Sequence, residues 1–208
     1  MKIKIKICGL TSPKEAQFLN KNHVDFAGMV LFFPKSRRNI SLEQAEQIME
    51  MLDRKIRSVA VVVSPTREQL VQIQKAGFDY VQIHGELSEA LLKEIHIPVW
   101  KAFNVNDLEQ VKLYHNQKNI AGYVFDGADY GSGKTFDWNL LKDIPRDGKL
   151  FLLAGGLNPS NVADAIRYVQ PDGVDVSSGV EKDFGKGKDG EKIEQFVEQV
   201  RAEETYRR

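Results

Sequence analysis

The chain has 208 residues, of which 42% are hydrophobic, and this is enough for one domain with a substantial apolar core. Lys and Arg number 29 and Asp and Glu number 29, so no excess of positive charge suggests binding to nucleic acid or an anionic membrane. There is no apolar run near the roughly 20 residues that span a bilayer, no secretory signal and no second cysteine for an internal disulfide, so a cytoplasmic location is expected.

The chain begins with a strand pattern that ends in its only cysteine. Three isoleucines alternate with Lys4, Lys6 and Cys8, and Gly9 follows. Alternation with a period of two predicts a half-buried strand over residues 3–8. Lys6 and Cys8 therefore share one face of this strand, and the isoleucines occupy the other face.

Seven further apolar runs predict strands, and helix signals lie between them. These strands are expected at residues 25–31, 57–62, 80–83, 99–103, 122–125, 150–153 and 173–176. Capping boxes begin at Ser12, Ser41 and Thr66, and Asn158 followed by Pro159 indicates another helix start. The last helix has an apolar face formed by Ile193, Phe196, Val197 and Val200.

This alternation of strands and helices continues about eight times without a linker or a low-complexity tract. It predicts a parallel sheet covered by helices, and a single (β/α)₈ TIM barrel of the phosphate-binding type over residues 1–208. The alternative is a doubly wound open sheet. That fold usually carries a glycine-rich fingerprint after its first strand, whereas this chain has Cys-Gly-Leu-Thr there.

A barrel places Cys8 at the end of an inward face, and active sites lie at the carboxyl ends of barrel strands. A lone cysteine can also be a small buried apolar residue. Two features favour a reactive thiol: its position, and Lys6 below it, since a nearby cation lowers the pKa of a thiol. Asp175 also faces inward on the last strand, next to the first in a closed barrel, and Lys6 is its candidate partner.

The ends of the last three strands carry further candidates. Asp126 ends the sixth strand and is a candidate acid or base, although an Asp before a glycine also forms turns. Small residues follow the seventh and eighth strands, where barrels commonly bind phosphate through backbone N–H groups. These residues include Gly155, Gly156, Ser178 and Gly179.

Three other features carry less information. The segment from Gly131 to Thr135 resembles a nucleotide-binding loop, but the position five before Gly133 is alanine where that pattern has glycine; a mobile glycine-rich loop over the barrel mouth is the better interpretation. Arg37 and Arg38 follow the second strand, where an arginine could hold a carboxylate. His84 ends the fourth strand, and a single histidine there is more often structural.

Taken in order, the strand ends resemble one family. The motifs are KICGLT, SRR, VQIHG, FDG with GSGKTFDW, LAGGLNPSNV, and GVDVSSGVE with GKGKD. Between Lys6 and Asp189 they resemble phosphoribosylanthranilate isomerase of tryptophan biosynthesis. The resemblance implies a (β/α)₈ barrel without cofactor or metal, acting on a small phosphorylated substrate. A monomer and a homodimer both remain open.

The resemblance also implies roles for single residues. Cys8 would be the general base and Asp126 the general acid. Arg38 would hold the anthranilate carboxylate, although Arg37 leaves this ambiguous, and Asp175 would help to hold the sugar. Phosphate would be bound by Gly155, Gly156, Ser178 and Gly179. One departure is the sequence 183–189, where a proline–glycine pair is expected.

The implied reaction is an Amadori rearrangement, which needs two proton transfers. An acid protonates the ring oxygen, and a base removes the proton on C2 of the sugar. Burial should raise the pKa of Asp126, and a cation should lower that of Cys8. The alternatives are a phosphotransferase that uses the Gly131 segment, a barrel that only binds a phosphorylated ligand, and the related aminoimidazole isomerase of histidine synthesis, which should carry Asp in place of Cys8.

Overall fold

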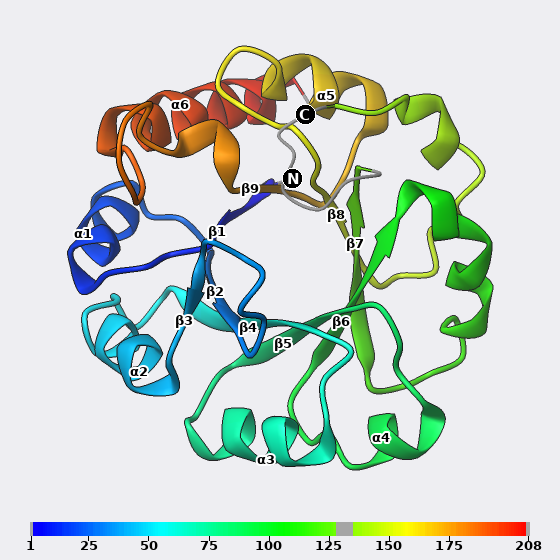
Figure 1. Ribbon diagram of the computed structural model, residues 1–208. Helices are drawn as coiled ribbons and strands as arrows, with labels where there is room; N and C mark the ends of the chain where they lie inside the picture. The colour runs from blue at the N-terminus through cyan, green and yellow to red at the C-terminus, as the bar shows by residue number, and fades with distance from the viewer. Residues whose placement is uncertain (1, 128–134, 207–208) are drawn as a thin grey trace.

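The alternating pattern at the N-terminus forms β1 (Lys4–Cys8), which lies between two parallel neighbours. One is β2 (Phe26–Leu31) and the other is β9 (Gly173–Val176), so the sheet closes on itself (Figure 1). The computed structural model describes residues 2–127 and 135–206. Within them all strand pairings of the barrel are parallel, which confirms the (β/α)₈ barrel and makes the doubly wound alternative wrong.

Between β2 and β9 the barrel runs through five more strands, and each predicted strand is present within two residues of its expected ends. They are β4 (Arg57–Val63), β5 (Tyr80–His84), β6 (Val99–Asn104), β7 (Ile120–Asp126) and β8 (Leu150–Leu153). The sequence analysis did not predict β3 (Asn39–Ile40), a two-residue strand beside the end of β2.

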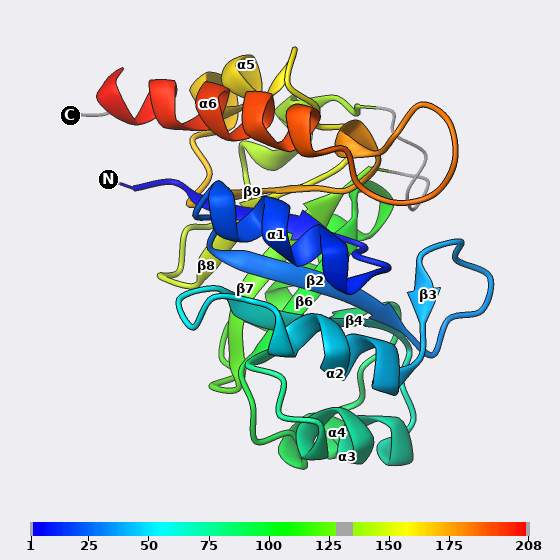
Figure 2. The ribbon, with the colours of Figure 1, turned by 90° about the vertical axis from the view of Figure 1, so that its left-hand side faces the viewer.

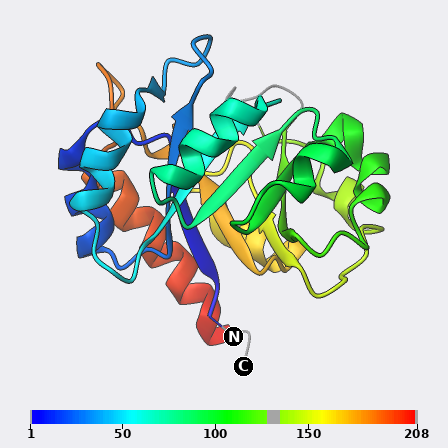
Figure 3. The same cartoon turned by 90° about the horizontal axis from the view of Figure 1, so that it is seen from below.

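Helices surround the strands on all sides (Figures 1 and 3). They are α1 (Pro13–Lys21), α2 (Leu42–Glu50), α3 (Arg67–Lys75), α4 (Glu89–Lys93), α5 (Val162–Val169) and α6 (Gly190–Tyr206). The boxes at Ser41 and Thr66 are confirmed, because each side chain accepts a hydrogen bond from the N–H three residues later. At Ser12 the backbone N–H donates to Glu15 over 3.1 Å.

Two connections and one boundary differ from the predicted helices. The segments η1 (Val105–Leu113) and η2 (Trp138–Leu141) are 3₁₀ helices, the first interrupted at the non-helical Asp107. The helix predicted from Pro159 begins later, as α5, with Asn161 before its first residue. The Asn158 carboxamide instead accepts the Ser160 N–H over 2.8 Å and so stabilises the preceding turn.

The alternation of each strand divides the apolar residues into two cores. Outward side chains, including Ile5 and Ile7 of β1 and the preceding Ile3, pack against the helices. Inward side chains fill the barrel, where Phe26 packs edge-to-face against Tyr80 and Trp100 near the amino ends of their strands, with ring centroids 4.7 to 5.7 Å apart. This aromatic layer closes the barrel below the groups at the carboxyl ends.

Candidate active site

The carboxyl ends of the strands surround a cavity of about 400 Å³. Most of the predicted site residues line it: Cys8, Arg38, Asp126, Gly155, Gly156, Asp175 and Ser178. Gly179 does not, and a Cβ atom there would lie 2.0 Å from the Leu157 carbonyl oxygen. Gly179 is therefore required for the turns after β8 and β9 to pack together.

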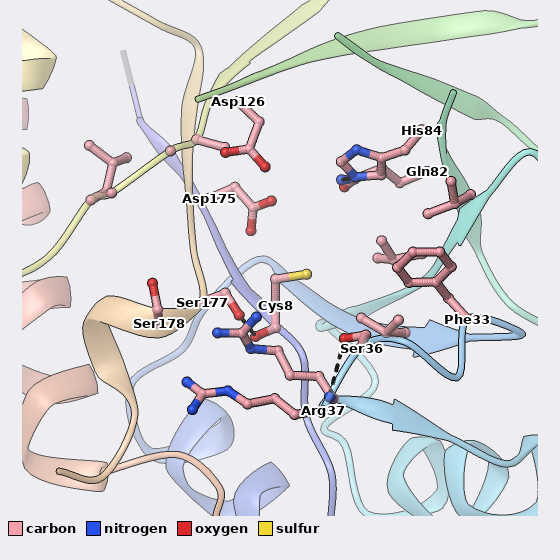
Figure 4. A pocket seen from close by; sticks show the side chains of 18 of the residues that line it. Cys8, Phe33, Ser36, Arg37, Gln82, His84, Asp126, Asp175, Ser177 and Ser178 are labelled. Atoms are coloured by element: carbon pink, nitrogen blue, oxygen red, sulfur yellow. Dashed lines mark hydrogen bonds between the residues drawn. The ribbon is translucent and has the colours of Figure 1, made fainter. Parts of the chain in front are cut away.

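Lys6 and Asp175 form the predicted pair inside the barrel. They are register partners on β1 and β9, and Lys6 Nζ donates to Asp175 Oδ2 over 2.8 Å. Burial alone would lower the pKa of Lys6, but the neighbouring Asp175 and Cys8 raise it above its ordinary value, so Lys6 is a fixed cation. The second oxygen of Asp175 is buried without a hydrogen-bond partner in the described residues, and its carboxyl group points into the cavity (Figure 4).

Cys8 stands beside this pair, but its titration differs from the expectation. Burial raises the pKa of the thiol above its ordinary value, and the negative charge of Asp175 adds to this effect. Lys6 and Lys188 oppose the shift without reversing it. The prediction of a lowered pKa is therefore wrong: the loss of hydration outweighs the nearby cations, and the free protein holds Cys8 as a thiol.

Asp126 ends β7 on the same cavity (Figure 4). Burial raises its pKa to about 6, while the Gly127 N–H, 2.8 Å from its carboxylate, acts in the opposite direction. The expected direction is confirmed. A fraction of Asp126 is protonated at neutral pH, so this carboxyl group can donate a proton there.

The turns after β8 and β9 leave backbone donors available. Gly155 and Gly156 have φ values of +82° and +67°, and a Cβ atom on Gly155 would lie 2.6 Å from the Gly127 nitrogen. Among the described residues, no turn or loop hydrogen bond uses the N–H groups of Gly155, Gly156 or Ser178. Ser178 begins the short η3 (Ser178–Val180). Successive free N–H groups in such turns form a concave site for an anion.

The two arginines after β2 both line the cavity but differ in exposure. The Arg38 side chain is 12% exposed and Arg37 is 68% exposed. Both donate to Glu181, which also accepts from Lys188. The sequence analysis assigned no role to Glu181 or Lys188, although both lie in the quoted motifs. The available signal in the sequence was an acidic and a basic residue in the motifs that follow the last strand.

The wall opposite the two aspartates is mainly apolar. Val30, Phe33, Val61 and Val63 belong to it, and Figure 4 shows Phe33 across the cavity from Asp126 and Asp175. Next to it, His84 Nε2 lies 2.8 Å from Gln82 Nε2. Burial lowers the pKa of His84 to about 3, so at neutral pH its imidazole is uncharged and is not an acid.

Other sequence features give a more limited result. Residues 131–134 of the glycine-rich segment lie outside the described residues. Within 2–127 and 135–206, no group of three or more His, Cys, Asp and Glu side chains is arranged to hold a metal ion. Over the same ranges, no helix combines the length and apolar character needed to cross a membrane.

Comparison with known proteins identifies the family of this chain. A family model described as N-(5'-phosphoribosyl)anthranilate (PRA) isomerase matches residues 5–199. The enzyme of that name from Aquifex aeolicus is 38% identical, covering 97% of this chain and 100% of its own length. The crystal structure of phosphoribosyl anthranilate isomerase from Thermotoga maritima has a TM-score of 0.84 and 34% identity, covering 96% of this chain and 99% of its own.

A second solved structure of this kind is in complex with reduced 1-(o-carboxyphenylamino)-1-deoxyribulose 5-phosphate. It is 33% identical to this chain, with a TM-score of 0.82 and coverage of 96% of this chain and 99% of that one. Both the family model and the relatives extend over nearly the whole barrel. The chain therefore belongs to the N-(5'-phosphoribosyl)anthranilate isomerase family.

Proposed function

We propose that this isomerase converts N-(5'-phosphoribosyl)anthranilate to 1-(2-carboxyphenylamino)-1-deoxyribulose 5-phosphate in tryptophan biosynthesis, with Asp126 as general acid and Cys8 as general base. The observation that carries the proposal is a carboxyl group with a pKa of about 6 and a thiol that face one cavity. An arginine and turns with available backbone N–H groups line the same cavity, as a substrate with a carboxylate and a phosphate requires.

The cavity suggests one orientation of the substrate. The phosphate would accept hydrogen bonds from the N–H groups of Gly155, Gly156 and Ser178. The aromatic ring would contact the apolar wall that contains Phe33, with its carboxylate on Arg38. The sugar then lies between Cys8 and Asp126, and the unpaired oxygen of Asp175 can accept a hydrogen bond from a sugar hydroxyl.

Two proton transfers complete the reaction in this orientation. Asp126 donates a proton to the ribose ring oxygen, and the C1–O bond breaks to give an iminium ion. Cys8 removes the proton from C2, which gives an enolamine, and this tautomerises to the ketone. Each positioned proton transfer typically accelerates a reaction about 10²- to 10⁴-fold.

The raised pKa of Cys8 is compatible with this mechanism because of the proton count. The resting pair is a thiol with a carboxylate, and the reactive pair is a thiolate with a carboxylic acid. Both forms hold one proton, so conversion requires its movement within the site and none from bulk water. Lys6 stabilises the thiolate once it forms, and Lys188 contributes in the same direction.

Two alternatives have less support. The aminoimidazole isomerase is expected to carry an aspartate where this chain has Cys8. A barrel that only binds phosphate would not need a protonatable carboxyl group and a thiol on one cavity. The phosphotransferase depends on the Gly131 segment, which departs from the nucleotide-binding pattern.

The test is a fluorescence time course with phosphoribosylanthranilate generated in the assay. Wild-type protein should consume it rapidly, and Cys8→Ala and Asp126→Asn should each be slower by about 10²- to 10⁴-fold. Circular dichroism establishes that both variants are folded. Absence of turnover by folded wild type would refute the proposed substrate, and near-normal turnover by Cys8→Ala would refute the assigned base.

A further inference from the structure

A cluster of ionic side chains extends outward from the lining of the cavity, and none of its members donates or removes a proton in the proposed mechanism. Its centre is Glu181, which follows η3 and does not line the cavity. Arg38 Nε donates to Glu181 Oε1 over 2.6 Å and Lys188 Nζ donates to the same oxygen over 3.3 Å, while Arg37 donates to Oε2. Burial by itself raises the pKa of Glu181, but Arg38 and the other cations lower it below its ordinary value, so Glu181 is ionised.

Glu181 holds Arg38 by one edge of its guanidinium. Arg38 Nε donates to Oε1, and Arg38 Nη2 donates to Oε2 over 3.3 Å. No hydrogen bond from Arg38 Nη1 occurs among the described residues, and Arg38 lines the cavity. Because a guanidinium has five N–H groups in a fixed plane, holding one edge determines where the other edge points. The free edge can bind a second carboxylate in the cavity.

The base of the loop that carries Glu181 is itself fixed. Glu181 and Lys188 form an antiparallel bridge. Lys188 Nζ donates to the Ser177 carbonyl oxygen over 3.0 Å, and the Lys188 backbone N–H donates to the buried Glu15. The contacts thus connect the end of β9, the loop and the arginine pair. Figure 2 shows this loop and the segment between β2 and β3 projecting on the same side of the barrel.

The charges of the cluster favour an anion. Arg37, Arg38 and Lys188 are three cations, and within the cluster they share the single carboxylate of Glu181. The nearby Asp183 carboxylate pairs with Lys192 instead. A ligand carboxylate beside Arg38 would therefore enter a region with an excess of positive charge, without displacing Glu181.

We infer that Glu181 is a positioning residue that fixes the guanidinium of Arg38 in the orientation needed to bind the substrate carboxylate. This inference rests on the proposed function. Glu181 acts through Arg38 and does not itself contact the substrate. Its removal should therefore weaken binding of the carboxylated ring and leave the proton transfers nearly unchanged.

The experiment compares Glu181→Gln with Asp183→Asn, the same acid-to-amide change two residues away on a side chain that is 74% exposed. Glu181→Gln should raise KM for phosphoribosylanthranilate by about tenfold to a hundredfold, the effect of losing a charge-assisted hydrogen bond. The value of kcat should stay within about threefold. Asp183→Asn should change neither constant.

Calorimetry with two stable ligands makes the test specific. The ligands are the reduced product and the same molecule without its carboxylate. Glu181→Gln should weaken binding of the first by the same factor as KM and leave binding of the second unchanged, which also shows that the variant is folded. Arg38→Gln should have the same pattern, and the double variant should be no worse than Arg38→Gln alone.

Three results separate the possible failures. Equal loss of affinity for both ligands, or no loss for either, would overturn the positioning role of Glu181. A selective loss of affinity for the carboxylated ligand in Arg37→Gln, but not in Arg38→Gln, would show that Arg37 binds the carboxylate and would overturn the role of Arg38. Absence of turnover by wild type, with the reduced product unbound, would instead contradict the proposed function.

Discussion

The two ends of the barrel interior are built by the same strands and have opposite chemistry. Near the amino ends the rings of Phe26, Tyr80 and Trp100 pack against one another, with Phe26 edge-to-face against the other two. Near the carboxyl ends, Lys6 and Asp175 share a buried space with a thiol. Burial of the aromatic rings in the lower layer stabilises the fold. Burial of the charged groups in the upper layer costs hydration energy, and their pairing offsets part of this cost.

This difference shows how a barrel can contain reactive groups. The aromatic layer and the outer core supply the stability that the upper layer uses. Asp126 and His84, the two cavity residues whose pKa values are most strongly shifted, both belong to the upper layer. Perturbed titration at one end and close packing at the other are consequences of one alternating pattern.

The largest expected effect comes from replacing the cation of the upper layer. Lys6→Met leaves the Asp175 carboxylate buried without its partner, so the free energy of unfolding should fall by about 3–5 kcal/mol. Turnover should also fall, because the thiolate of Cys8 loses a stabilising cation. Urea denaturation and the fluorescence assay measure the two effects.

The matched control is the double variant Lys6→Met with Asp175→Asn. It gives the upper layer the uncharged character of the lower one and should recover most of the stability without recovering turnover. If the double variant were as unstable as Lys6→Met, the charge pair would not be the source of the loss.

The lower layer can be disrupted by Trp100→Ala. The cavity left in the barrel should reduce the free energy of unfolding by about 3–5 kcal/mol. Trp100 does not line the active-site cavity, so kcat of the folded variant should remain within a few-fold of wild type. Leu113→Ala, at a side chain 64% exposed, should cost less than about 0.5 kcal/mol. A large loss of kcat in folded Trp100→Ala would mean that the two layers are not separate.

A smaller effect, of opposite sign, is expected for the stability of Asp126→Asn. The pKa of Asp126 is about 6 in the folded protein against an ordinary 3.8, so wild type loses stability as pH rises from about 4 to 6. The variant lacks this penalty and should be more stable by about 2–3 kcal/mol at pH 8. Urea denaturation should show the difference disappearing near pH 3, and an advantage that persisted there would have another cause.

The smallest effect, about tenfold for each pH unit, concerns the rate profile. Between pH 6 and the pKa of the thiol, protonated Asp126 decreases as thiolate increases, so kcat/KM of wild type should be level. Below pH 6 it should fall tenfold per unit. In Asp126→Asn only the thiol titrates, so the residual kcat/KM should rise tenfold per pH unit from pH 6 up to the pKa of the thiol. A level profile in this variant would show that Asp126 does not titrate in the reaction.

The fold and most of the residues around the cavity could be predicted from the sequence, because alternation within a strand and the order of strands and helices are visible along the chain. Alternation in β1 placed Lys6 and Cys8 on one face, and closure of the barrel brought Lys6 to Asp175. The ends of the strands could also be predicted from the sequence, since buried strands are continuous apolar runs bounded by polar and small residues.

The remaining features depend on distances between segments. The pKa of Cys8 results from burial acting against two cations and one anion, and a list of neighbours does not give its sign. The role of Gly179 depends on the approach of another turn, and that of Glu181 on a loop meeting two arginines from a distant segment. The segments η1 and η2 were not identified as 3₁₀ helices, because η1 is interrupted at the non-helical Asp107 and η2 spans only four residues.

The pairing of Lys6 with Asp175 has a consequence for the order in which the protein is made. The two residues are 169 positions apart, so a ribosome completes β9, the second neighbour of β1, only after the other strands of the barrel. Until β9 emerges, the nascent sheet keeps two open edges that can pair with other chains. Contacts of such long sequence separation also form slowly. Because the site includes residues of both strands, catalytic activity appears only after β1 and β9 have paired. Every active molecule therefore has a closed barrel.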